Sequence, residues 1–288
     1  MDEASFKTVS IVGVGLIGGS LALAIKKAKI AEKIIGLGRR MESLEKALQK
    51  GVIDFPTLSP EEAFSQADLI VLATTPATIP AFFPQIGRFA KEGCLVTDVG
   101  SVKRRIIEES VKLPEHIVFV GGHPLAGMEK KGVEWADAEL FKDSVYILTP
   151  SPRSTAEGMR KLSELVRAIG AKPLVMDAER HDLLLSYTSH FPHILAFALS
   201  LLFSRLCEKE ERARSLVAGG FKSMTRIAKS PADMWEEIFI ENKDNLLKVW
   251  GEWERIMNEI RKGLEEGKLR EILEKAKEER EKLDEACL

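Results

Sequence analysis

The sequence has few of the residues that build disulfide frameworks and metal centres. Only three cysteines occur in 288 residues, and Cys94, Cys207 and Cys287 stand far apart. They can form neither a network of disulfides nor a Cys-x-x-Cys metal pair. We therefore expect a protein of the reducing cytoplasm without a metal site.

The sequence also lacks an excess of charge and a long apolar run. Its 42 Lys and Arg residues against 44 Asp and Glu residues give a net charge of −2, which excludes a globally basic nucleic-acid binder. The longest apolar stretch, residues 191–203, contains Pro192 and His193 and is shorter than a bilayer span. The N-terminus is too polar for a signal peptide. We expect neither a nucleic-acid nor a membrane partner.

The chain is divided by its hydrophobic pattern, and its length favours about two domains. Up to Met176, short β-rich runs alternate with amphipathic stretches, as in a doubly wound parallel sheet. The predicted strands are residues 9–12, 33–37, 69–73, 95–98, 117–120, 145–148 and 172–176. From Ala178 onward nearly every stretch has helical period. We predict an α/β domain over residues 1–176 and an all-α domain over residues 177–288.

One predicted helix in the second part, residues 182–207, is apolar on most of its surface. Such a helix cannot lie on the surface of a monomer. It is either the central helix of its domain or part of a subunit interface, and we favour both at once. Further helices are predicted at 233–262 and 268–286. We expect a homodimer.

A glycine-rich segment, Gly13-Val14-Gly15-Leu16-Ile17-Gly18, directly follows the first predicted strand and opens a helix. The three glycines would allow a tight turn, close approach of a pyrophosphate and close helix–strand packing. A lone G-x-G-x-x-G can be a simple turn, but this position favours a dinucleotide site in a Rossmann-like domain. We assign the cofactor to Gly13, Gly15, Leu16, Ile17 and Gly18, and to Thr74 and Pro76 after strand 69–73.

The end of the second predicted strand bears on the choice of cofactor. An acidic residue that would bind the ribose 2′-hydroxyl of NAD is replaced by Gly38, followed by Arg39 and Arg40. No carboxylate repels a 2′-phosphate there, and a guanidinium can pair with one. The arginines can also be plain solvated charges. We expect NAD(P), with NADP slightly favoured over NAD.

Two polar residues follow neighbouring strands of the predicted sheet. Ser101 comes after strand 95–98 and His123 after strand 117–120, so both should face the ligand crevice. A neutral imidazole there can accept a hydroxyl proton, with Ser101 as a second hydrogen-bond partner. The alternatives are a loop histidine bonded to backbone and a helix N-cap serine. His116 is expected at the surface, and His181 is assigned no role.

The helical part offers candidates for substrate binding. His190 and His193 are three residues apart and share a helix face, but without a third ligand they make a poor metal site. They are either core histidines or a polar, substrate-binding spot. Lys222 and Arg226 lie on a segment that begins with two glycines, which suits an anionic substrate unless it is a surface turn.

Several motifs together resemble the prephenate dehydrogenase family, which comprises the prephenate, arogenate and cyclohexadienyl dehydrogenases of tyrosine synthesis. They are GVGLIGGSLA, TDVGSVK, GGHPLAGMEKKG, ILTP, SHFPHILAFAL, GGFKSMTRIA and MWEEIFIEN, in family order over essentially the whole chain. The resemblance implies a Rossmann-like N-terminal domain and an all-α C-terminal dimerisation domain. Many family members have Asp where Gly38 stands.

The resemblance also implies an activity, the oxidative decarboxylation of prephenate or arogenate with hydride transfer to NAD(P)+. His123 matches the histidine that bonds the ring hydroxyl, and Ser101 matches its partner. His193 and Arg226 match residues that hold the carboxylate-bearing end of the substrate. Trp235 matches an aromatic residue that reaches the neighbouring subunit's site.

Two other functions are compatible with a two-domain dinucleotide-binding plan. A 3-hydroxy acid dehydrogenase or imine reductase would use a helix lysine as acid and base. A non-catalytic dinucleotide sensor would leave Ser101, His123 and Arg226 without a role. Residues alone do not separate prephenate from arogenate.

Overall fold

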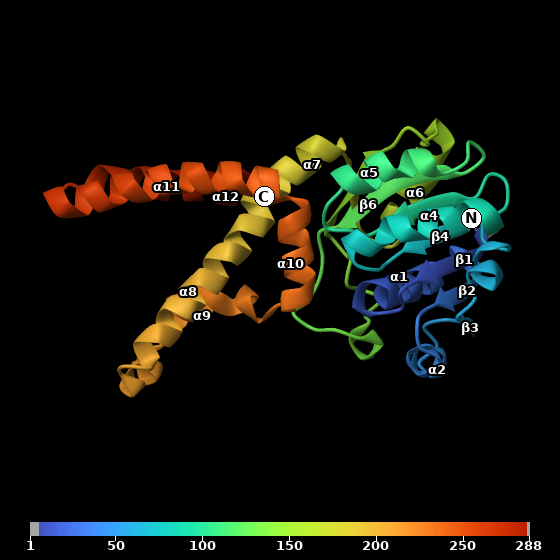
Figure 1. Ribbon diagram of the computed structural model, residues 1–288, viewed down its shortest axis with the longest axis horizontal. Helices are drawn as coiled ribbons and strands as arrows, with labels where there is room; N and C mark the ends of the chain where they lie inside the picture. The colour runs from blue at the N-terminus through green and yellow to red at the C-terminus, as the bar shows by residue number, and fades with distance from the viewer. Residues whose placement is uncertain (1–5, 287–288) are drawn as a thin grey trace. The chain divides into compact units, whose positions relative to one another are not determined.

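The computed structural model describes residues 6–286, and the chain forms two compact units that meet in sequence between Asn242 and Lys243. The first unit holds an eight-stranded sheet and the helices up to α10; Figure 1 shows its strands and connecting helices in blue to green. The second unit holds two helices. The domain boundary at residue 176 stays a prediction.

The sheet has the strand order β3-β2-β1-β4-β5-β6-β7-β8. Its strands are β1 (Phe6–Val12), β2 (Ala31–Leu37), β3 (Phe55–Thr57), β4 (Leu69–Leu72), β5 (Leu95–Asp98), β6 (Val118–Pro124), β7 (Val145–Pro150) and β8 (Lys172–Val175). The first six are parallel in the order of a dinucleotide-binding sheet. The predicted parallel pairing fails only at β7, which runs antiparallel to β6. The connection between them contains only a short 3₁₀ turn, Val133–Trp135, in place of a crossover helix.

Helices cover both faces of the sheet because alternate strand residues point to opposite sides. Val9 and Ile11 belong to one apolar cluster, with residues of α1 (Leu16–Lys27), α2 (Met41–Gln49) and α6 (Ala156–Ala168). Val12 belongs to the other, with residues of α3 (Pro60–Phe64), α4 (Phe83–Phe89) and α5 (Arg104–Glu109). In such a three-layer arrangement, ligands bind at the carboxyl edge of the parallel strands.

The predicted long apolar helix is a continuous helical stretch, Ala178–Cys207. It consists of α7 (Ala178–Leu185), a π-helical turn (Ser186–His190) and α8 (Phe191–Cys207). By length and composition it would suffice to cross a membrane, so the absence of a membrane partner stays a prediction. Only Phe191 and Ala196 of α8 are buried.

The remaining helices of the first unit are α9 (Gly219–Thr225) and α10 (Ala232–Glu241). The second unit consists of α11 (Lys243–Glu266) and α12 (Arg270–Ala286), joined at Gly267, whose φ of 69° lies in the left-handed region. The helix predicted over residues 233–262 is therefore two helices, and Asn242 lies between them.

Candidate active site

The carboxyl ends of β1, β4, β5 and β6 lie next to one another at one edge of the sheet. Gly13 follows β1, Thr74 follows β4 and Ser101 follows β5. His123 was expected after strand 117–120, but it is the next-to-last residue of β6 itself, where it pairs with Ile147 of β7. The topology therefore brings the predicted cofactor residues and His123 to a common edge.

The glycine loop has three different steric environments. Gly13 has a φ of 91°, and a Cβ there would lie 2.7 Å from the Ala73 carbonyl oxygen. A Cβ on Gly18 would meet the Gly13 carbonyl oxygen at 2.2 Å, so helix α1 packs too closely for any side chain. A Cβ on Gly15 would meet nothing within 4 Å. The open space beside Gly15, at the first turn of α1, fits the pyrophosphate of a dinucleotide.

Other residues assigned to the cofactor lie around this loop. The Thr74 hydroxyl is buried and has no hydrogen-bond partner among the described residues, which leaves it for a bound ligand. Pro76 is buried at the start of a 3₁₀ helix, Leu16 is buried and Ile17 is half-buried. Arg39 and Arg40 are exposed, and a Cβ on Gly38 would lie 3.1 Å from the Leu44 side chain. The residues present fit a dinucleotide.

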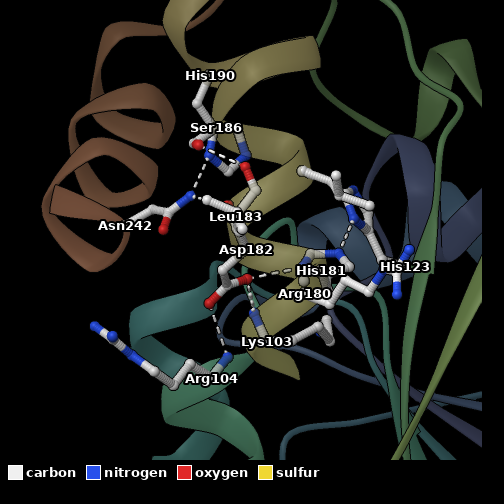
Figure 2. A network of polar contacts seen from close by, with 12 residues as sticks. Lys103, Arg104, His123, Arg180, His181, Asp182, Leu183, Ser186, His190 and Asn242 are labelled. Carbon is white, nitrogen blue, oxygen red and sulfur yellow. Dashed lines mark hydrogen bonds and ion pairs between the residues drawn. The ribbon is translucent and has the colours of Figure 1, made fainter. Parts of the chain in front are cut away.

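His123 is the first member of a buried chain of polar side chains (Figure 2). Its Nδ1 lies 2.8 Å from Nε2 of His181, and Nδ1 of His181 lies 2.7 Å from Oδ1 of Asp182. The Asp182 carboxylate also accepts the backbone N–H groups of Lys103 (2.8 Å) and Arg104 (2.9 Å) at the start of α5. His181 was assigned no role from the sequence, and Asp182 was not among the predicted site residues. The only available signal was a histidine beside an aspartate at the start of the apolar helix.

A second buried carboxylate, at the end of β5, stabilises the backbone around His123. Asp98 forms an ion pair with the fully buried Lys103. It also accepts the backbone N–H groups of Gly100 (2.8 Å) and Gly122 (3.1 Å). Gly122 precedes His123, so Asp98 fixes the backbone that carries the imidazole.

Burial controls the protonation of these groups. It holds the pKa of His123 well below its usual value, and the nearby His181, Lys103 and His190 act in the same direction. Burial also lowers the pKa of His181, although Asp182 opposes the shift. Burial alone would raise the pKa of Asp182, but the hydrogen bonds from His181 and the α5 backbone leave it lowered. His123 and His181 are therefore neutral and Asp182 is charged at neutral pH.

His190 and His193 lie beside Trp235, but their environments differ. His190 is buried with Nδ1 2.9 Å from the Asn242 side-chain nitrogen, and burial lowers its pKa to about 4. His193 donates from Nδ1 to the Ser189 carbonyl oxygen (2.9 Å) and stacks on Trp235, with ring centroids 3.4 Å apart. Trp235 is only 7% exposed. The expectation that it reaches a neighbouring subunit's site stays a prediction.

One of the two predicted cations, Arg226, lies near this aromatic pair. Arg226 forms an ion pair with Glu129, from the segment after β6, and both charges act on His193. Lys222 is exposed on α9, and Ser101 is half-buried. His116 is exposed, as expected. Within residues 6–286, no group of three or more His, Cys, Asp or Glu side chains is placed to hold a metal ion.

Comparisons of this chain with known proteins identify its family. Residues 21–175 match the family model for the nucleotide-binding domain of prephenate dehydrogenase, and residues 177–278 match that for its dimerization domain. The chain belongs to the prephenate dehydrogenase family. A prephenate dehydrogenase of Bacillus subtilis is 36% identical over 261 residues, which cover 90% of this chain and 70% of the relative. A cyclohexadienyl dehydrogenase of Zymomonas mobilis is 34% identical over 248 residues, or 85% of this chain and 84% of the relative.

A solved structure is similar over nearly the whole chain. Prephenate dehydrogenase from Aquifex aeolicus, in complex with hydroxyphenyl propionate and NAD+, superposes with a TM-score of 0.89 at 33% identity. The match covers 97% of this chain and 98% of that chain. The family and fold class expected from the sequence are confirmed. As a prephenate dehydrogenase family member, the chain is an NAD(P)-dependent oxidoreductase.

Proposed function

We propose that this chain catalyses the oxidative decarboxylation of prephenate or arogenate in tyrosine synthesis. The observation that carries the proposal is a buried, neutral His123 at the sheet edge where the glycine loop opens. When bound, the nicotinamide supplies the hydride acceptor. As hydride leaves the hydroxyl-bearing ring carbon, His123 takes the hydroxyl proton, assisted by Ser101. Loss of CO2 makes the ring aromatic, and this supplies the driving force.

The helical residues hold the rest of the substrate. Arg226 binds a substrate carboxylate in exchange for Glu129, and Lys222 adds a second positive charge. His193 donates to Ser189 from Nδ1, which leaves Nε2 toward the ligand, and Trp235 fixes its ring by stacking. His190 is the remaining polar contact, since its Nε2 has no hydrogen-bond partner among the described residues.

The chain binds NAD, and we propose that NADP is slightly favoured. Arg39 is exposed, and it follows Gly38 where the adenosine ribose would lie. Arg40 adds positive charge nearby. A guanidinium can pair with a 2′-phosphate through two parallel N–H bonds.

We propose a homodimer and a cytoplasmic location, and the exposed apolar surface of α8 supports the homodimer. Leu201, Leu202 and Leu206 are at least half exposed, and the matching family model is a dimerization domain. A second copy would remove this apolar surface from water. Sedimentation at micromolar concentration should show one two-subunit species, and a stable, active monomer would exclude the dimer.

Steady-state turnover tests the function. Purified enzyme is mixed with prephenate or arogenate and with NAD+ or NADP+, and reduced nicotinamide is followed by absorbance. We expect turnover of at least one substrate with both cofactors, and none with a panel of 3-hydroxy acids. Cofactor binding without turnover of either cyclohexadienol would overturn the proposal.

A further inference from the structure

The chain from His123 to Asp182 has a defined direction of hydrogen bonding. Asp182 accepts two backbone N–H groups and has a lowered pKa, so its carboxylate is ionised and can only accept. Nδ1 of His181 must therefore carry the proton of the 2.7 Å hydrogen bond to Asp182. All three side chains are buried, and His181 is 0% exposed.

The tautomer of His181 determines the tautomer of His123. A neutral imidazole with a proton on Nδ1 has a lone pair on Nε2, so Nε2 of His181 is an acceptor. Nδ1 of His123, 2.8 Å away, must then donate. In a neutral His123 this leaves Nε2 without a proton, as an acceptor. Among the described residues no other group hydrogen-bonds this Nε2 atom.

We propose that His181 and Asp182 are positioning residues that hold His123 with its Nε2 unprotonated, ready to accept the substrate hydroxyl proton. This inference rests on the proposed function. As hydride leaves the ring carbon, the hydroxyl proton moves to Nε2 of His123. After the bond to CO2 breaks and its electron pair enters the ring, the proton returns to the phenolate oxygen. No proton is gained or lost overall.

The same chain stabilises the transient positive charge. When Nε2 of His123 is protonated, its Nδ1 proton is shared with His181, whose other side faces the Asp182 carboxylate. The other ionisable groups acting on the two imidazoles are Lys103, Asp98 and His190. Lys103 is paired with Asp98, and His190 is neutral, so the Asp182 carboxylate balances the charge.

Nitrogen-15 NMR tests the tautomer directly, because the chain has only five histidines. In enzyme labelled at histidine, we expect His123 to carry its proton on Nδ1, with Nε2 bare, at neutral pH. The assignment comes from the loss of its signals in His123→Asn. A wild-type His123 protonated on Nε2 would overturn the inference. This measurement needs no substrate, so it separates the tautomer from the proposed function.

Two substitutions of His181 separate its two hydrogen bonds. The side-chain amide of Gln reaches the position of Nε2 of His181 and keeps an acceptor for His123. The side-chain amide of Asn reaches only the position of Nδ1 and keeps the hydrogen bond to Asp182. We expect His181→Asn to lower kcat about 100-fold with KM changed less than threefold, and to give a mixture of His123 tautomers. His181→Gln should recover most of kcat and the single tautomer.

The control is His116→Asn, which replaces an exposed histidine and should leave kcat and the His123 signals unchanged. Equal kcat losses in His181→Asn and His181→Gln, or wild-type kcat in His181→Asn, would overturn the inference. If His181→Asn does not fold, the wild-type tautomer and the kcat of His181→Gln decide. A fall in kcat of more than tenfold in a folded His181→Gln would then count against it.

Discussion

Two regions meet at the carboxyl edge of the sheet and are built in different ways. The glycine loop is a backbone site, whose open space depends on the lack of a Cβ at Gly15 and on the close packing at Gly18. The histidine cluster is a side-chain site, in which His123 meets the consecutive residues His181 and Asp182 from 58 residues further along the chain. The glycine loop consists of six consecutive residues, whereas the histidine cluster forms only when the chain folds.

The largest effect expected is in the side-chain site. His123→Asn keeps the approximate size of the residue and a polar contact to His181 but removes the proton acceptor. Loss of a general base costs about 10²–10⁴ in rate. We expect kcat to fall by that factor with substrate binding mostly retained, as measured by steady-state kinetics and by equilibrium binding. A kcat near that of the wild type would mean that the proton goes elsewhere.

Acid should lower the stability of the folded chain through the buried His190. The pKa of His190 is about 4 in the folded state, against 6.5 as its ordinary value. Between these pH values the unfolded chain binds a proton that the folded chain excludes, so stability falls as the pH falls. The loss from this residue is about 3 kcal/mol between pH 7 and pH 4.

Urea unfolding of the wild type and of His190→Gln over this range measures the contribution. The wild type should lose more stability than the variant, by the amount above. Because His123, His181 and His193 also have lowered pKa values, only the difference between the two proteins isolates His190. Parallel pH profiles would contradict the expectation.

In the backbone site, two glycine substitutions should act differently. Gly15→Ala adds a Cβ into open space, so the melting temperature should stay unchanged. The methyl group would keep the pyrophosphate away, and we expect NAD affinity to fall about 30-fold, or about 2 kcal/mol. Gly18→Ala forces a contact of 2.2 Å on the Gly13 carbonyl oxygen and should lower the melting temperature as well. Equal melting temperatures of the two variants would contradict the different roles of Gly15 and Gly18.

Arg226 tests the outer part of the side-chain site. A guanidinium–carboxylate contact is worth roughly 1.5–3 kcal/mol. Arg226→Ala should therefore raise the substrate KM at least tenfold, with a smaller effect on kcat. Lys229→Ala, three residues further along and also exposed, is the matched control. An unchanged KM in Arg226→Ala would make the residue a plain surface cation.

Cofactor choice is expected to show the smallest effect. Arg39→Ala should lower kcat/KM for NADP about tenfold and leave NAD nearly unchanged. Gly38→Asp should move preference toward NAD, with Gly38→Ala as the control for crowding of Leu44, which a Cβ approaches at 3.1 Å. A wild type that already favours NAD tenfold would show that the arginines are solvated charges.

The two regions also differ in how much the sequence predicted. The glycine loop, its strand and its helix are local in sequence, so spacing alone located them. His181 was assigned no role because its contact with His123 spans 58 residues, and a single sequence gives no sign that such residues meet. Strand β3 was missed because it has only three residues and contains Pro56, and a proline disfavours a strand.

The π-helical turn at Ser186–His190 has a consequence for how this helix can change. It accommodates one residue more than an α-turn, so the side chains after it are rotated by about 100°. That rotation sets the direction of His193 and also of the exposed leucines of α8. Deletion of one residue from this turn would rotate His193 and the exposed leucines together. Any change that removes or adds a residue at this turn therefore alters the direction of His193 and the exposed apolar surface of α8 together.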